Sequence, residues 1–164
     1  GLPLAGRALA SAWAASPVPD APALALWRHV SVLREWRGDN HLAELIGHGL
    51  TGLEAGVFHE VDLPVPAVRR RVMGRRFFRI TRGWSEEQWG EAVARLTARG
   101  LVEGEPEAHR LTPDGMALYD EIEAGTDAVS GAAFTDAAEG LIERMRPVSK
   151  AVIDAGVLPG SKKA

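Results

Sequence analysis

The chain has 164 residues, of which 46% are hydrophobic and 25% charged, with a formal net charge of −3. This length and composition are typical of one globular domain with a sizeable core. The sequence has no cysteine, which excludes disulfides, thiolate metal sites and cysteine nucleophiles. No apolar run approaches the roughly 18 residues of a membrane span, and no signal-peptide pattern opens the chain. We therefore expect a cytoplasmic protein that makes no membrane contact.

The two ends of the chain differ in composition from its middle. Residues 7–15 are alanine-rich and are expected to be the end of a helix that begins upstream. Three prolines among residues 17–22 remove backbone donors and favour an extended linker. We therefore divide the chain into a leading segment at residues 1–21, a main domain at residues 22–156 and a loose tail at residues 157–164.

Helix signals follow one another through the first half of the main domain. Apolar spacing predicts a helix at residues 22–38 that ends at a glycine, and Asp39 is predicted to cap a second helix that ends near Gly47 or Gly49. Thr51 and Glu54 have the spacing of a capping box, which predicts a further helix start. Pro66 is suited to the first position of a short helix at residues 66–73.

A dense basic run occupies residues 69–82, and no acidic residue lies between Leu63 and Gly83. Arginine offers a planar fork that fits phosphate oxygens, so this run is our first candidate for holding a DNA backbone. The alternatives are a solvated basic face and a membrane-surface helix, for which the apolar face is too short. The arginines of the run are Arg69, Arg70, Arg71, Arg75, Arg76, Arg79 and Arg82.

Residues 84–119 predict helix, strand, turn, strand and helix in that order. Ser85 and Gln88 form a second capping-box pattern, and the apolar stripe of the helix that follows runs to Leu96. A short apolar strand begins at Leu101, and Thr112 opens the last helix of the pattern. The predicted fold is therefore mostly α: a winged helix-turn-helix with flanking helices and a short two- or three-stranded wing sheet.

The surfaces that a winged helix presents to DNA carry mixed charges here. In such proteins the start of the second helix reads base edges, and the wing enters the minor groove. From Gly83 through Glu107 the sequence has six acids against two arginines, which is unfavourable beside phosphates. Acidic residues in the first turn of a helix also interact favourably with the helix dipole, so they have a structural explanation. We nevertheless list as DNA contacts, besides the arginine run, Ser85, Gln88, Arg95, His109 and Arg110.

Catalytic and metal patterns are weak. His41, Glu44 and His48 share a helix face, but the two histidines lie two turns apart, about 10 Å, which is too far for one ion. No P-loop, nucleophile elbow or dinucleotide fingerprint is present. We expect no enzyme activity, metal or cofactor. The five tryptophans are expected to pack the core, or to line a pocket for a small hydrophobic ligand.

Two stretches carry a resemblance to known regulators. Residues 93–102 and 111–115 resemble the MarR family of winged-helix proteins. Residues 26–153 look more broadly like actinobacterial proteins labelled MarR-like helix-turn-helix, through residues 33–41, 52–54 and 82–85. This resemblance implies a winged-helix regulator whose family motifs include Asp39, His41, Glu54 and Trp84. With Trp36, these residues are our candidates for a ligand-binding network.

The most direct interpretation is a MarR-like DNA-binding transcriptional regulator that binds double-stranded DNA. The helix from Ser85 would enter the major groove while residues 69–82 hold the backbone. A homodimer is expected through the terminal helices, which begin near Pro22 and Thr135. The alternative is a winged helix that binds a small hydrophobic effector or another protein, for example in secondary metabolism.

Overall fold

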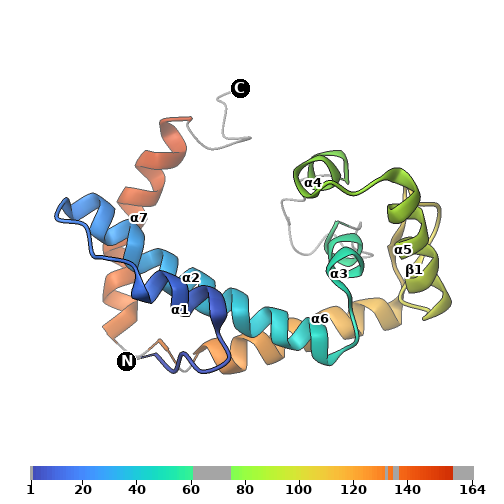
Figure 1. Cartoon of the computed structure of the whole chain (residues 1–164), viewed down its shortest axis with the longest axis horizontal. Coiled ribbons are helices and arrows are strands. Elements are labelled where there is room, and N and C mark those ends of the chain that lie inside the picture. Colours follow the sequence, from blue (N-terminus) through green and yellow to red (C-terminus); the bar gives the residue numbers. More distant parts are fainter. Residues whose placement is uncertain (1, 61–74, 132, 135–136, 157–164) are drawn as a thin grey trace. The chain divides into compact units, whose positions relative to one another are not determined.

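The computed structural model describes residues 2–60, 75–131, 133–134 and 137–156, drawn in colour in Figure 1. The chain packs as two units, of which the first spans Pro3–Val129 and the second begins at Ser130. The predicted helix at residues 66–73 lies outside the described residues. In the part that the structure describes, no helix is both long and apolar enough to cross a membrane.

The first unit begins with α1 (Ala8–Ala15), which packs along the much longer α2 (Pro22–Gly47) (Figure 1). The segment before Pro22 is therefore packed into the same unit as the helices that follow it. We predicted that α2 would end at Gly38, and this was wrong. Gly38 continues the helix, because one glycine in a helix interior costs only about 1 kcal/mol.

Asp39 does cap a helix, but the helix is α1. Its carboxylate accepts hydrogen bonds from the backbone amides of Leu9 at 3.3 Å and Ala10 at 2.9 Å. Arg7, at the N-cap of α1, supplies no capping hydrogen bond of its own. Asp39 therefore caps a different helix from the one that we expected, and its partner Leu9 lies 30 residues away in the sequence.

Three helices and a small sheet supply most of the apolar core of the first unit, and Leu45 of α2 and Ile122 also belong to it. The three helices are α3 (Gly52–His59), α4 (Arg75–Arg82) and α5 (Glu86–Ala98), with β1 (Val102–Glu103) and β2 (Arg110–Leu111). Both predicted capping boxes are confirmed, at Thr51 for α3 and at Ser85 for α5. The predicted stripe on α5 is buried as well, since Trp89 and Leu96 are 0% exposed.

Close packing of α3 against α4 depends on a glycine. The ring of Phe78 covers Gly56 so closely that a Cβ atom built there would lie 2.2 Å from Cζ of the ring. Phe78 also meets Trp89 of α5 edge-on at 5.9 Å between ring centroids. One aromatic side chain thus fixes α4 against both neighbouring helices.

At the position of the predicted wing, the two strands form an antiparallel pair in which Val102 faces Leu111 and Glu103 faces Arg110; residues 102–111 are called the wing below. Within the described residues this sheet has two strands, as the pattern of residues 84–119 predicted. Thr112 then caps α6 (Pro113–Gly131) by accepting from the amide of Gly115 at 3.0 Å. The second unit contains α7 (Ala137–Asp154), which includes Pro147.

Candidate nucleic-acid interface and adjoining pocket

Helices α4 and α5 are joined by a turn of three residues, 83–85. Gly83 has a φ of +72°, a backbone conformation that glycine adopts without steric strain. The amide of Trp84 donates to the carbonyl of Arg79 at 3.1 Å and closes the end of α4. Ser85 then accepts from the amide of Gln88 at 3.1 Å, while the Gln88 side chain accepts from the amide of Ser85 at 2.9 Å. Two short helices joined by such a turn have the form of a helix-turn-helix.

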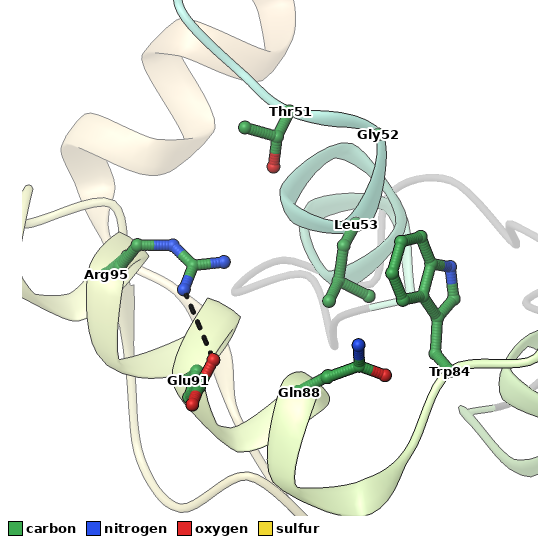
Figure 2. Close-up of a pocket in the computed structure, with 7 residues that line it drawn as sticks. All are labelled: Thr51, Gly52, Leu53, Trp84, Gln88, Glu91 and Arg95. Atoms are coloured by element: carbon green, nitrogen blue, oxygen red, sulfur yellow. Dashed lines mark ion pairs between the residues drawn. The ribbon is translucent and has the colours of Figure 1, made fainter.

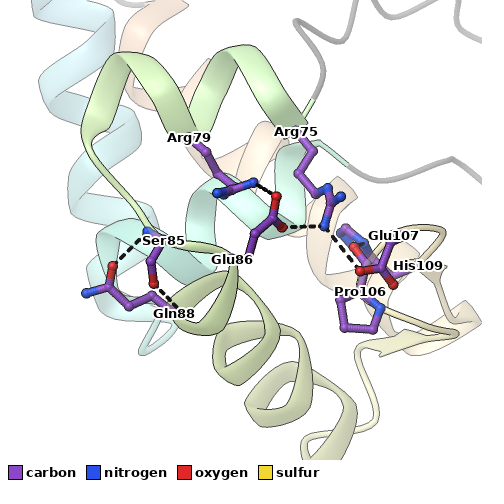
Figure 3. Close-up of polar contacts among 8 residues, drawn as sticks. All are labelled: Arg75, Arg79, Ser85, Glu86, Gln88, Pro106, Glu107 and His109. Atoms are coloured by element: carbon purple, nitrogen blue, oxygen red, sulfur yellow. Dashed lines mark hydrogen bonds and ion pairs between the residues drawn. The ribbon is translucent and has the colours of Figure 1, made fainter.

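The basic run and the acidic start of α5 meet directly (Figure 3). Nη1 of Arg75 lies 2.9 Å from Oε2 of Glu86 and 3.5 Å from Oε1 of Glu107 in the wing. Arg79 forms an ion pair with the other oxygen of Glu86. Opposite charges that the sequence separates by up to 32 residues therefore neutralise one another across α4, α5 and the wing. These ion pairs partly offset the negative charge of the α5 start and the wing, which is unfavourable for DNA binding. They also occupy Arg75 and Arg79.

Two other arginines of α4 remain available. Arg76 is exposed and has no hydrogen-bond or ion-pair partner among the described residues. Arg82 is exposed too, and its guanidinium lies over the ring of Phe78 at 4.1 Å from the centroid, with no ion pair in the described part of the chain. Arg69, Arg70 and Arg71, which we also predicted as phosphate contacts, lie outside the described residues.

The remaining predicted DNA contacts have partners within the fold. Ser85 and Gln88 cap α5 as described above, and Arg110 pairs with Glu103 on the opposite strand at 2.6 Å. His109 is buried, with Nε2 3.1 Å from the carbonyl oxygen of Val57 and Nδ1 3.3 Å from that of Pro106. Its position connects the wing to α3, and its ring has no exposed edge for DNA.

Arg95 of α5 forms an ion pair with the buried carboxylate of Glu54 in α3. Its Nε lies 2.7 Å from Oε1 of Glu54, whose side chain is 6% exposed, while the side chain of Arg95 is 49% exposed. Burial raises the pKa of the Glu54 carboxyl, but hydrogen bonds from the backbone amide of Thr51 and from Arg95 outweigh this. The pKa therefore falls below its ordinary value of 4.5. This pair links the cap of α3 to the middle of α5.

The five predicted ligand-binding residues occupy four separate places. Trp36 and Asp39 hold the N-terminal segment, since Nε1 of Trp36 donates to the carbonyl of Pro3 at 3.0 Å and Asp39 caps α1. Glu54 belongs to the ion pair with Arg95, and Trp84 lines the pocket described below. His41 lies between α3 and α6. The described helices thus do not bring all five into one pocket.

His41 takes part in a hydrogen-bonded chain that the sequence did not reveal. The hydroxyl of Thr126 donates to the carbonyl of Ile122 at 2.7 Å, so its oxygen accepts from Nδ1–H of His41 at 2.9 Å. Nε2 of His41 then accepts from Nε2–H of His59 at 3.1 Å. Burial lowers the pKa of His41 below its ordinary value of 6.5, which favours this neutral arrangement.

A pocket of about 270 Å³ lies between the start of α3 and one side of α5 (Figure 2). Its α5 wall consists of Gln88, Glu91 and Arg95, which recur at helical spacing, and Trp84 closes one end. Of the lining residues, we predicted Trp84 as ligand-binding and Gln88 and Arg95 as DNA contacts, whereas Thr51, Gly52, Leu53 and Glu91 were not predicted. Glu91 lies three residues after Gln88 and four before Arg95, so helical spacing was the signal that could have identified it. The full lining is Thr51, Gly52, Leu53, Trp84, Gln88, Glu91 and Arg95.

Among the described residues, no group of three or more histidine or acidic side chains is placed to hold a metal ion. Comparison with known proteins gave one informative result. The model of a helix-turn-helix family matches residues 1–159. No curated protein and no solved structure matches the chain.

Proposed function

The chain belongs to a helix-turn-helix family, and from this premise we propose that it is a MarR-like transcriptional regulator that binds double-stranded DNA through α4 and α5. The observation that carries the proposal is the geometry of α4, its three-residue turn and the capped α5, with Arg76 and Arg82 exposed on α4. In helix-turn-helix proteins the first helix crosses the DNA backbone and the second enters the major groove. Exposed arginines on α4 are therefore where phosphate contacts are needed.

The ion pairs at the start of α5 make this docking compatible with an acidic helix. Glu86 would repel phosphates if it stood alone, but Arg75 and Arg79 neutralise it from α4 (Figure 3). Arg75 extends the same compensation to Glu107 of the wing. The proposal assigns Arg75 and Arg79 to shaping the interface, and Arg76 and Arg82 to holding the backbone.

Fluorescence anisotropy with labelled duplexes tests this assignment. We expect the double variant Arg76→Ala/Arg82→Ala to bind a duplex pool on the order of tenfold more weakly, since each side chain contributes a charge-assisted hydrogen bond to phosphate. The matched control is Arg34→Ala/Arg146→Ala, which changes net charge equally at side chains that are 77% and 69% exposed. Equal losses in both variants would contradict the proposed interface.

A second candidate function is suggested by the pocket beside α5. Trp84 and Leu53 give it an apolar wall, and Gln88 and Glu91 supply polar groups (Figure 2). A small hydrophobic effector bound there would lie against the helix that we propose to read DNA. Such a ligand should quench tryptophan fluorescence in the wild type, and Trp84→Phe should remove the part of the quenching that comes from Trp84. Unchanged quenching in Trp84→Phe would place the ligand elsewhere.

We also propose that the regulator is a homodimer. The first half of α2 exposes several large apolar side chains, among them Trp27, which is 60% exposed, and Leu24, which is 55% exposed. Apolar area of this kind favours association with a second chain. Enzyme activity has no place in the proposal.

A further inference from the structure

Five polar residues lie at the cap and in the first turns of α5, the part of a helix-turn-helix protein that meets base edges. They are Ser85, Glu86, Glu87, Gln88 and Glu91. The contacts of four of them are already assigned within the protein. Ser85 and Gln88 satisfy each other's backbone amides in the capping box. Glu86 holds Arg75 and Arg79.

Glu91 lies about one turn after Glu87 on α5, and its carboxylate faces Arg95. Its Oε2 lies 3.8 Å from Nη1 of Arg95, and it lines the pocket against α3 (Figure 2). Glu87 is different. It is exposed and makes no hydrogen bond or ion pair with any residue in the described part of the chain.

The position of Glu87 on the helix also suits a base contact. At about 3.6 residues per turn, Glu87 lies half a turn around the axis from Leu96, which is fully buried. A Cβ atom at Gly90 would lie 3.9 Å from Pro106, so the Gly90 side of α5 faces the wing. Glu87 therefore projects away from the core, in the first turn, where recognition helices contact bases.

We propose that Glu87 is a specificity-determining residue that reads cytosine in the major groove. An ionised carboxylate only accepts hydrogen bonds, and the amino group N4 of cytosine is a donor on the major-groove edge. The N6 donor of adenine stands next to the acceptor N7, and guanine presents two acceptors, so both are less favourable for a carboxylate. The inference rests on the proposed DNA binding.

Selection from a pool of random duplexes, followed by competition with single-base variants of the selected site, tests the inference. We expect the wild type to require cytosine at one position, with a discrimination of roughly 5- to 100-fold against other bases. Glu87→Ala should lose the preference at that position and keep it elsewhere. Glu87→Gln should shift the preference toward adenine, because glutamine pairs with N6 and N7 of adenine.

The control is Glu121→Ala, which removes an exposed acid from α6 and should leave every base preference unchanged. If Glu87→Ala binds with the wild-type preferences, the inference fails while the proposed DNA binding stands. If the wild type binds no duplex at low salt, both fail.

Discussion

Replacing Glu54 with glutamine keeps a hydrogen-bonding side chain in the capping box of α3 but removes the charge that faces Arg95. The Glu54 carboxylate is buried and accepts from the amide of Thr51 at 2.9 Å and from Arg95 at 2.7 Å. A hydrogen bond to a charged group contributes about 1.5–3 kcal/mol. Because Arg95 is half exposed, water can solvate it once its partner is neutral, so we expect Glu54→Gln to cost about 1–2 kcal/mol.

Glu54→Ala removes the cap as well and should cost about 1 kcal/mol more. For a chain of this length, 1 kcal/mol lowers Tm by about 2–4 °C. Urea and thermal unfolding monitored by circular dichroism measure both losses. The double variant Glu54→Gln/Arg95→Ala should lose less than the sum of the single variants, because one interaction is removed twice.

The pH dependence gives an independent check on the same pair. The pKa of Glu54 is lowered on folding, so its charge stabilises the fold above the ordinary value of 4.5, and this stabilisation is lost as the pH falls through the lowered pKa. The difference in unfolding free energy between the wild type and Glu54→Gln should therefore shrink below pH 4.5. Equal unfolding free energies of Glu54→Gln and the wild type at pH 7 would contradict a stabilising ion pair between Glu54 and Arg95.

Three further results are expected. Gly56→Ala should lower the unfolding free energy by about 1–3 kcal/mol because the Phe78 ring must move, and urea denaturation that matches the wild type would contradict this packing. The wild type should lose stability as the pH falls below 6.5, since folding lowers the pKa of His41 and favours its neutral form. His41→Gln should weaken that dependence, and an unchanged pH profile would exclude His41 as its source. Trp27→Glu should convert a dimer into a monomer in sedimentation experiments, and a variant that still sediments as a dimer would contradict this interface.

Local signals predicted the parts of the fold that depend on neighbouring residues. The capping boxes at Thr51 and Ser85 and the apolar stripe of α5 involve residues three or four apart, and all are confirmed. The two-stranded wing and the cap at Thr112 were predicted from the order of short patterns. These features need no knowledge of what packs against them.

Interactions between distant segments were not predictable in the same way. Asp39 has a side chain suited to capping a helix. The sequence does not show that the helix it caps is α1 rather than a helix that begins at Asp39 itself. The pairing of Arg75 with Glu86 depends on the angle between α4 and α5. In the sequence the basic and acidic residues occupy separate segments, whereas in the folded chain their side chains form ion pairs. His59 gave no signal at all, since its contact with His41 spans 18 residues.

The salt dependence of duplex binding shows directly whether the arginines of α4 neutralise DNA phosphates. Neutralising one phosphate contributes a slope of about 0.9 in a plot of log affinity against log salt. We expect a wild-type slope of about 2 or steeper, reduced by about 2 in Arg76→Ala/Arg82→Ala. The absence of duplex binding at low salt, or the same slope in both proteins, would contradict this role of the arginines.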